Sequence, residues 1–138
     1  MPRTLLVPLD GSPQSKAALE YAVETVPESE IVVIYVLNPA VAATGVDGMI
    51  PDSAFDEQRQ FAEELFADAR DVAGEDRIVE TELLAGRAAT EIVEYATKNG
   101  IGEIVMGSHG RDGAARLLLG SVSETVVRRS PVPVTVVR

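Results

Sequence analysis

Short apolar runs alternate with helix-spaced segments along the whole of this chain, and this alternation constrains the fold more than any other feature. The runs are rich in valine, isoleucine and leucine, as strands buried on both faces usually are. The segments between them place small and apolar residues at helical spacing, after a capping or turn residue. Strict alternation of this kind predicts a parallel sheet with helices on both faces, joined by right-handed crossovers.

The boundaries of the expected elements follow from these runs and from the residues beside them. Strands are expected over 4–9, 30–37, 77–84, 101–106 and 134–137. Helices are expected from Pro13 to just before Pro27, from a cap at Asp52 or Ser53 to near Val72, over 88–98, and over 121–129. Residues 38–53 show no periodicity, and loops of that length are usually functional or disordered. At 138 residues the chain is expected to be one α/β domain of three layers.

The composition excludes several classes of site and of protein. The chain has no cysteine, which excludes disulfides, thiolate metal sites and cysteine nucleophiles. The first residues enter the first expected strand directly, without the pattern of a signal peptide. The longest apolar runs have the length of a strand and are too short to cross a bilayer. A cytoplasmic location is therefore expected.

The chain is strongly acidic, with 22 acidic against 12 basic residues and a net charge of −10. This charge argues against non-specific binding to nucleic acid and against docking on an anionic membrane. Only two of the basic residues, Lys16 and Lys98, are lysines. An acidic surface with few lysines fits a proteome adapted to high salt, where screening weakens self-repulsion. An ordinary acidic cytosolic protein is the other interpretation, and both stay open.

A glycine-patterned stretch after the fourth expected strand carries the clearest functional signal. It contains Gly107 and Gly110, and Gly120 and Ser121 then open the last expected helix. Glycines let a backbone approach a ligand closely, and the first N–H groups of a helix lack helical partners and carry partial positive charge. A strand that feeds such a loop predicts a phosphate site at the carboxyl ends of the strands. The alternatives are that Ser121 only caps its helix and that the glycines only form turns.

The spacing Gly107-x2-Gly110-x9-Gly120-Ser121 resembles the ATP-binding pattern of the universal stress protein family. Three further stretches are similar to the same family. They are residues 7–12 in its first strand and turn, residues 86–92 in its third turn and helix, and residues 130–134 in its last strand. The resemblance covers essentially the whole chain. It implies one nucleotide-binding domain over residues 1–138, with a five-stranded parallel sheet of order 3-2-1-4-5 and helices on both faces.

The resemblance also implies a ligand, a partner and a set of site residues. The ligand is ATP, with Mg or Mn held mainly by the phosphates, and the partner is a second copy of the chain. An apolar sheet edge over Val132–Val137 supports a homodimer independently, because an exposed edge strand needs a partner. The residues implied to bind ATP are Pro8, Leu9, Asp10, Val36, Met106, Gly107, Gly110, Gly120, Ser121 and Val122.

Some of these residues have a second interpretation. Asp10 is expected to reach the ribose or the adenine, but it also stands where a helix cap is needed before Ser12. Val36 would meet the adenine through its backbone. Met106 and Val122 would line the pocket, or they would belong to the core.

The favoured function is an ATP-binding regulatory module that acts as a switch in a stress response. The alternatives are a slow ATP hydrolase and a nucleotide-independent interaction module of the same fold. Catalysis needs a positioned base, and the chain offers only Asp10 or His109 and no Walker A motif, so no catalytic residue is assigned. A lone loop histidine such as His109 is expected at the surface. Arg111 and Arg116 either neutralise the β- and γ-phosphates or are solvated side chains.

Overall fold

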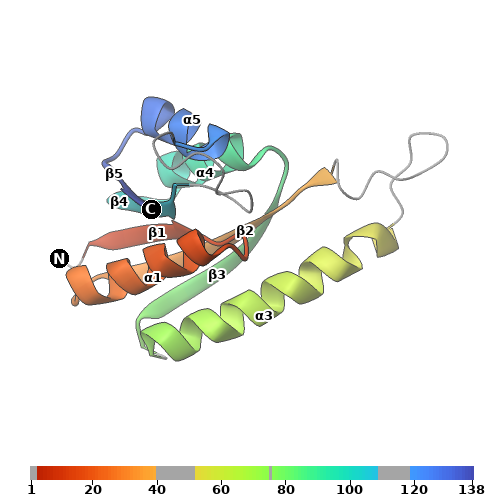
Figure 1. Ribbon diagram of the computed structural model, residues 1–138, viewed down its shortest axis with the longest axis horizontal. Coiled ribbons are helices and arrows are strands. Elements are labelled where there is room, and N and C mark those ends of the chain that lie inside the picture. Colours follow the sequence, from red (N-terminus) through yellow and green to blue (C-terminus); the bar gives the residue numbers. More distant parts are fainter. Residues whose placement is uncertain (1–2, 40–51, 75, 109–118) are drawn as a thin grey trace.

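The computed structural model describes residues 3–39, 52–74, 76–108 and 119–138, which form a five-stranded sheet flanked by helices (Figure 1). Neighbouring strands are parallel and follow the order β3-β2-β1-β4-β5. The elements are β1 (Thr4–Pro8), α1 (Pro13–Thr25), β2 (Glu30–Leu37), the 3-10 helix η2 (Asp52–Phe55), α3 (Asp56–Ala73), β3 (Ile78–Ala85), α4 (Ala88–Lys98), β4 (Glu103–Gly107), α5 (Ser121–Arg129) and β5 (Val134–Val137). The predicted fold class and strand order are confirmed.

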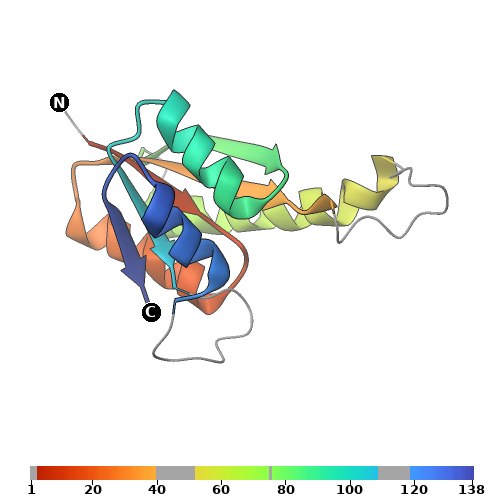
Figure 2. The same ribbon diagram turned by 90° about the horizontal axis from the view of Figure 1, so that it is seen from above.

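Helices cover both faces of the sheet (Figure 2), with α1 and α3 on one side and α4 and α5 on the other. The alternation of side chains along a strand builds both layers of the core. In β1, Leu5 and Val7 pack with α1 and α3, whereas Leu6 packs with α4 and α5, and all three side chains are fully buried. Burial on both faces explains why the central strands are continuous apolar runs rather than alternating ones.

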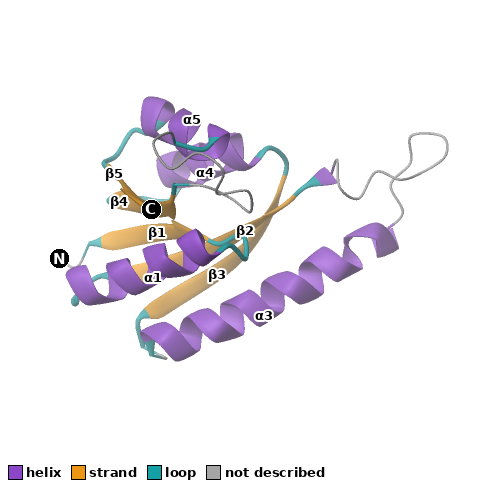
Figure 3. Cartoon of the chain, in the orientation of Figure 1, coloured by secondary structure: helices purple, strands orange, loops and turns teal. Residues whose placement is uncertain are grey.

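The order of the strands places a switch point between β1 and β4. From β1 the chain proceeds through β2 to β3 at one edge, and then crosses to β4 and β5 at the other edge. Strands and helices alternate throughout (Figure 3), so the loops that follow the strands meet at the carboxyl edge of the sheet. Ligands of open parallel sheets bind outside this edge, beside the switch point.

Local sequence signals account for most helix ends. The Ser12 hydroxyl accepts a hydrogen bond from the Ser15 N–H at 3.1 Å, and Pro13 occupies the first turn of α1. Gly74 ends α3 with a φ of +88°, a conformation that favours glycine. The bounds of α4 and α5 are those predicted. Within the described residues, every helix is too short or too polar to cross a membrane.

The predicted start of α3 is wrong. A cap was expected at Asp52 or Ser53, but these residues belong to η2, and α3 begins at Asp56 after Phe55. Phe55 has helical backbone angles and packs against the core below α3, and the Arg59 guanidinium lies over its ring. The change from η2 to α3 thus coincides with the contact of this half-buried ring with the core. The strands predicted over 30–37 and 134–137 are confirmed, and the bounds of β1, β3 and β4 differ from the predicted ones by one or two residues.

Candidate functional site

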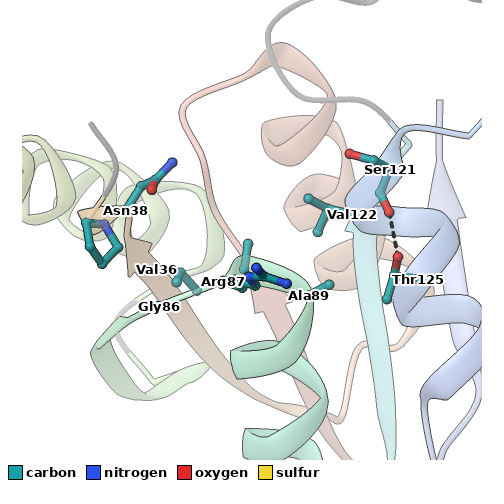
Figure 4. A pocket seen from close by; sticks show the side chains of 10 residues that line it. Val36, Asn38, Gly86, Arg87, Ala89, Ser121, Val122 and Thr125 are labelled. Atoms are coloured by element: carbon teal, nitrogen blue, oxygen red, sulfur yellow. Dashed lines mark hydrogen bonds between the residues drawn. The ribbon is translucent and has the colours of Figure 1, made fainter. Parts of the chain in front are cut away.

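A pocket of about 640 Å³ opens beside the carboxyl ends of β2 and β3 (Figure 4). Three segments form its walls: the end of β2, the turn from β3 into α4, and the first turns of α5. This volume is in the range typical of small-molecule sites. The described residues that line it are Val36, Asn38, Pro39, Gly86, Arg87, Ala88, Ala89, Ser121, Val122 and Thr125.

The N-terminus of α5 presents hydrogen-bond donors at one wall of this pocket. Gly120 precedes the helix and offers no side chain to cap it, so the first N–H groups of α5 have no partner within the helix. Ser121 and Val122 are both exposed, and the Thr125 hydroxyl donates to the Ser121 carbonyl at 2.9 Å (Figure 4). Partial positive charge at this end of the helix favours an anionic group.

The two ends of the glycine-patterned stretch are joined by hydrogen bonds. The Ser108 carbonyl accepts from the Gly120 N–H at 2.7 Å and from the Ser123 hydroxyl at 2.7 Å. Ser108 itself is buried, and its N–H donates to the Val137 carbonyl at 2.8 Å. These bonds hold β4, β5 and the start of α5 together. Because the Gly120 N–H is already used, the backbone donors left for a ligand begin at Ser121.

The turn after β1 is organised by its own side chains. The Asp10 carboxylate accepts a hydrogen bond from the Ser12 N–H at 2.8 Å, which forms an Asx turn before α1, whereas the helix cap expected of Asp10 is Ser12. Asp10 is exposed. Gly11 holds a φ of +84°, and a Cβ at this position would lie 2.4 Å from the Phe61 ring of α3. The turn is therefore fixed by α3 and keeps Asp10 at the sheet edge.

The structure brings some of the predicted ATP-binding residues together and separates others. Val36, Ser121 and Val122 line the pocket. Pro8, Leu9 and Asp10, Met106 and Gly107, and Gly120 lie at the same sheet edge but are not among the residues that line this pocket. The Leu9 and Met106 side chains are buried in the two halves of the core, so only their backbones face the edge. Gly110, His109, Arg111 and Arg116 lie outside the described residues.

Comparison with known proteins decides the family. The sequence profile described as "Universal stress protein family" matches residues 1–138. This chain belongs to the universal stress protein family. A universal stress protein of Methanocaldococcus jannaschii is similar to it, with 34% identity over 143 residues that cover 99% of this chain and 82% of the relative.

Solved structures of universal stress proteins share the fold. The protein from Lactobacillus plantarum aligns with a TM-score of 0.85 and 24% identity, over 99% of this chain and 97% of that one. A universal stress protein solved in complex with cAMP aligns with a TM-score of 0.70 and 22% identity, over 99% and 97% of the two chains. One from Archaeoglobus fulgidus solved in complex with dAMP aligns with a TM-score of 0.68 and 19% identity, over 100% and 98%. These likenesses show that the universal stress protein fold accepts nucleotides in other members.

Sequence reasoning missed one charged residue of the pocket. Arg87 follows the turn glycine Gly86 at the end of β3, and its side chain lines the pocket opposite α5. Its position after a strand end was visible in the sequence. That α4 lies beside α5, which brings Arg87 to this pocket, follows only from which face of the sheet each helix covers.

The shifted pKa values of the described residues lie away from this pocket, on the α4 side of β3. Tyr95 donates a hydrogen bond to the Glu80 carboxylate at 3.3 Å. Burial, followed by the charges of Glu80 and Glu82, raises the pKa of Tyr95 to about 12. Burial, followed by the charge of Glu80, raises the pKa of Glu82 above its ordinary value. A pair of carboxylates beside a buried phenol explains these shifts without a catalytic role.

Replacing Glu80 by glutamine is expected to lower the pKa of Tyr95, because the substitution removes a negative charge but keeps a hydrogen-bond acceptor. In the native protein, Tyr95 keeps its proton between its ordinary pKa of 10 and about 12, so the free energy of unfolding falls as the pH rises through this range. The phenolate absorbance of the folded protein, followed against pH, measures the shift. Glu94→Gln is the control, because Glu94 is an exposed residue of α4, the helix that carries Tyr95. Identical titration curves for Glu80→Gln and the native protein would contradict this account.

The described residues contain no group of three or more histidine, cysteine, aspartate or glutamate side chains placed to hold a metal ion. The pocket side chains are chemically suited to a different ligand. Val36 and Val122 give an apolar wall for a base, and the Ser121 hydroxyl and the start of α5 give donors for an anionic group.

Proposed function

We propose that this universal stress protein is an ATP-binding regulatory module of the cytoplasm, whose nucleotide occupancy sets a conformational or oligomeric state in a stress response. One observation carries the proposal. The apolar side chain of Val36 at the end of β2 and the N-terminus of α5, which lacks a side-chain cap, line one pocket at the carboxyl edge of the sheet. The cAMP and dAMP complexes of structural relatives support nucleotide as the ligand class.

The conformation of Gly120 supports a close approach by phosphate. Its φ is −66° and its ψ is 164°, angles that any residue adopts, so the backbone conformation does not require glycine here. We therefore assign glycine at Gly120 to ligand access, with Ser121 as donor to the phosphates. Mg or Mn, if bound, is held mainly by the phosphates of ATP.

The partner in this proposal is a second copy of the chain. β5 is an edge strand that pairs with β4 alone in the described sheet, and its side chains are only half-buried. Pairing through Val132–Val137 would satisfy the open backbone groups of this edge. Ser108 is hydrogen-bonded both to β5 and to the residue that precedes α5. Ligand binding at α5 would therefore be coupled through these hydrogen bonds to the edge strand β5.

The test is the nucleotide content of the purified protein and of two variants, Gly120→Val and Ser121→Ala. Freshly purified protein is denatured and the released nucleotide is identified and quantified. ATP is expected from the native protein and at least about 10-fold less from each variant, since each loses a phosphate contact or the space for one. Thr97→Ala is the matched control, because Thr97 is an exposed residue of α4 whose hydroxyl donates to the Val93 carbonyl.

If the folded native protein releases no nucleotide and binds no added ATP with Mg or Mn, the chain is a nucleotide-independent interaction module. Sedimentation with and without ATP then tests the second half of the proposal: a nucleotide-dependent change in the monomer–dimer equilibrium is expected.

A further inference from the structure

Arg87 occupies a distinctive position in the candidate pocket. Gly86, with a φ of +141°, turns the chain at the end of β3, and Arg87 follows with extended backbone angles as the residue that precedes α4. Its side chain makes no capping bond to α4. In Figure 4 the guanidinium lies between Val36 on the β2 side and Ser121 and Val122 on the α5 side. The Arg87 side chain is exposed and lines the pocket between these two walls.

The charge of Arg87 is not neutralised by a carboxylate in the described part of the chain. Arg3, Arg59 and Arg128 each form an ion pair with an acidic residue, and Arg87 forms none with residues 3–39, 52–74, 76–108 or 119–138. Among the described residues that line the pocket, Arg87 is the charged one. A guanidinium has five N–H donors in a planar fork that matches a phosphate.

Two helix N-termini add to this local positive charge. α4 begins at Ala88 and α5 at Ser121, both residues line the pocket, and neither helix has a side-chain cap from its preceding residue. By contrast, α1 is capped by Ser12. Each uncapped N-terminus carries partial positive charge. The pocket thus combines the full positive charge of Arg87 with two partial ones, and Glu91 and Glu124 in the first turns of α4 and α5 offset part of the latter.

We propose that Arg87 is a specificity-determining residue of this pocket, which binds a phosphate group of the ligand and selects nucleoside phosphates over uncharged nucleosides. The inference rests on the proposed nucleotide function and extends it to the β3–α4 turn, a second anion-binding element beside the start of α5. Val36 and Val122 would hold the base of either ligand, whereas Arg87 would interact only where a phosphate is present.

The experiment compares the binding of ATP and adenosine by calorimetry to the native protein, Arg87→Gln and Arg87→Lys. Arg129→Gln is the matched control, because Arg129 is an exposed residue at the far end of α5 and its loss changes the net charge equally. Arg87→Gln is expected to weaken ATP binding by about 10- to 100-fold, as loss of a charged hydrogen bond predicts, and to leave adenosine binding unchanged. Arg87→Lys keeps the charge but not the fork, and should recover part of the loss.

Equal weakening of ATP and adenosine would make Arg87 a packing residue, and unchanged ATP binding would make it a solvated one. If the native protein binds neither ligand, the proposed function fails, and inorganic tripolyphosphate decides the inference. Thermal stabilisation by tripolyphosphate that is lost in Arg87→Gln but kept in Arg129→Gln would still establish the anion site. Stabilisation that is absent from the native protein, or equal in all variants, would exclude it.

Discussion

Gly107→Ala is expected to lower the free energy of unfolding by about 3 kcal/mol, with no ligand present. Gly107 ends β4 at the point where α1 crosses it. A Cβ here would lie 2.8 Å from the backbone carbon of Gln14 and 2.9 Å from the Ser15 nitrogen. These are backbone atoms of a capped first turn, so they cannot rotate away as a side chain would. The substitution must shift α1 relative to β4 and loosen the layer between them.

Urea denaturation of the ligand-free protein measures this effect, and Gly102→Ala is the control. The Cβ at Gly102 would meet mainly the flexible side chain of Arg3, at 3.0 Å, so this variant should stay within about 0.5 kcal/mol of the native protein. If Gly107→Ala unfolds at the native urea concentration but binds ATP weakly, Gly107 serves the ligand and not the packing. Phosphate access, as the sequence predicts, would then be enough to explain why residue 107 is a glycine.

Arg77→Met is expected to lower the free energy of unfolding by about 2–3 kcal/mol, since it removes hydrogen bonds from a charged donor. The half-buried Arg77 guanidinium donates to the carbonyls of Val26 at 2.8 Å and Ser29 at 3.0 Å, and to the Ser29 hydroxyl at 3.1 Å. The last turn of α1 has no basic residue of its own. Arg77, the residue before β3, thus supplies the positive charge and the hydrogen-bond donors that the C-terminal end of α1 lacks.

Methionine keeps the length and apolar stem of Arg77 while removing the donors, so the measured change reports the hydrogen bonds. Arg70→Met is the matched control: Arg70 is exposed, its one side-chain partner is the Thr81 hydroxyl at 3.4 Å, and a change below about 0.5 kcal/mol is expected. Equal chemical denaturation midpoints for Arg77→Met and Arg70→Met would show that water satisfies the end of α1 as well as Arg77 does.

These two residues differ in how far the sequence predicts them. Gly107 stands out because a glycine follows an apolar run, but its contact with Gln14 depends on the angle at which α1 crosses the sheet. Arg77 gives no signal at all, because its partners lie about fifty positions earlier in the chain. Long-range hydrogen bonds of this kind depend on which strands become neighbours, and a local pattern does not contain that information.

The candidate site divides in the same way. Val36, Ser121 and Val122 were implied as site residues by the family resemblance, and they line one pocket. Arg87 was missed as a pocket residue, because only the packing of α4 beside α5 brings the β3–α4 turn opposite Ser121. The Gly120 N–H was predicted as a phosphate donor, but it donates to the Ser108 carbonyl. This hydrogen bond joins the residue after β4 to the residue before α5, two positions that only the tertiary fold brings together.

Local sequence patterns were enough to predict the alternation of strands and helices and most of their ends, because apolar periodicity and capping residues act over a few neighbouring positions. The spacing of the glycines and Ser121 was enough to indicate the family. The sequence also determined that glycines and a serine stand at the carboxyl edge of a parallel sheet. Only the tertiary structure decided which backbone donors remain for a ligand, which arginine enters the pocket, and why Gly107 admits no side chain. Those outcomes depend on distances between segments remote in the chain, which are set when the helices pack on the two faces of the sheet.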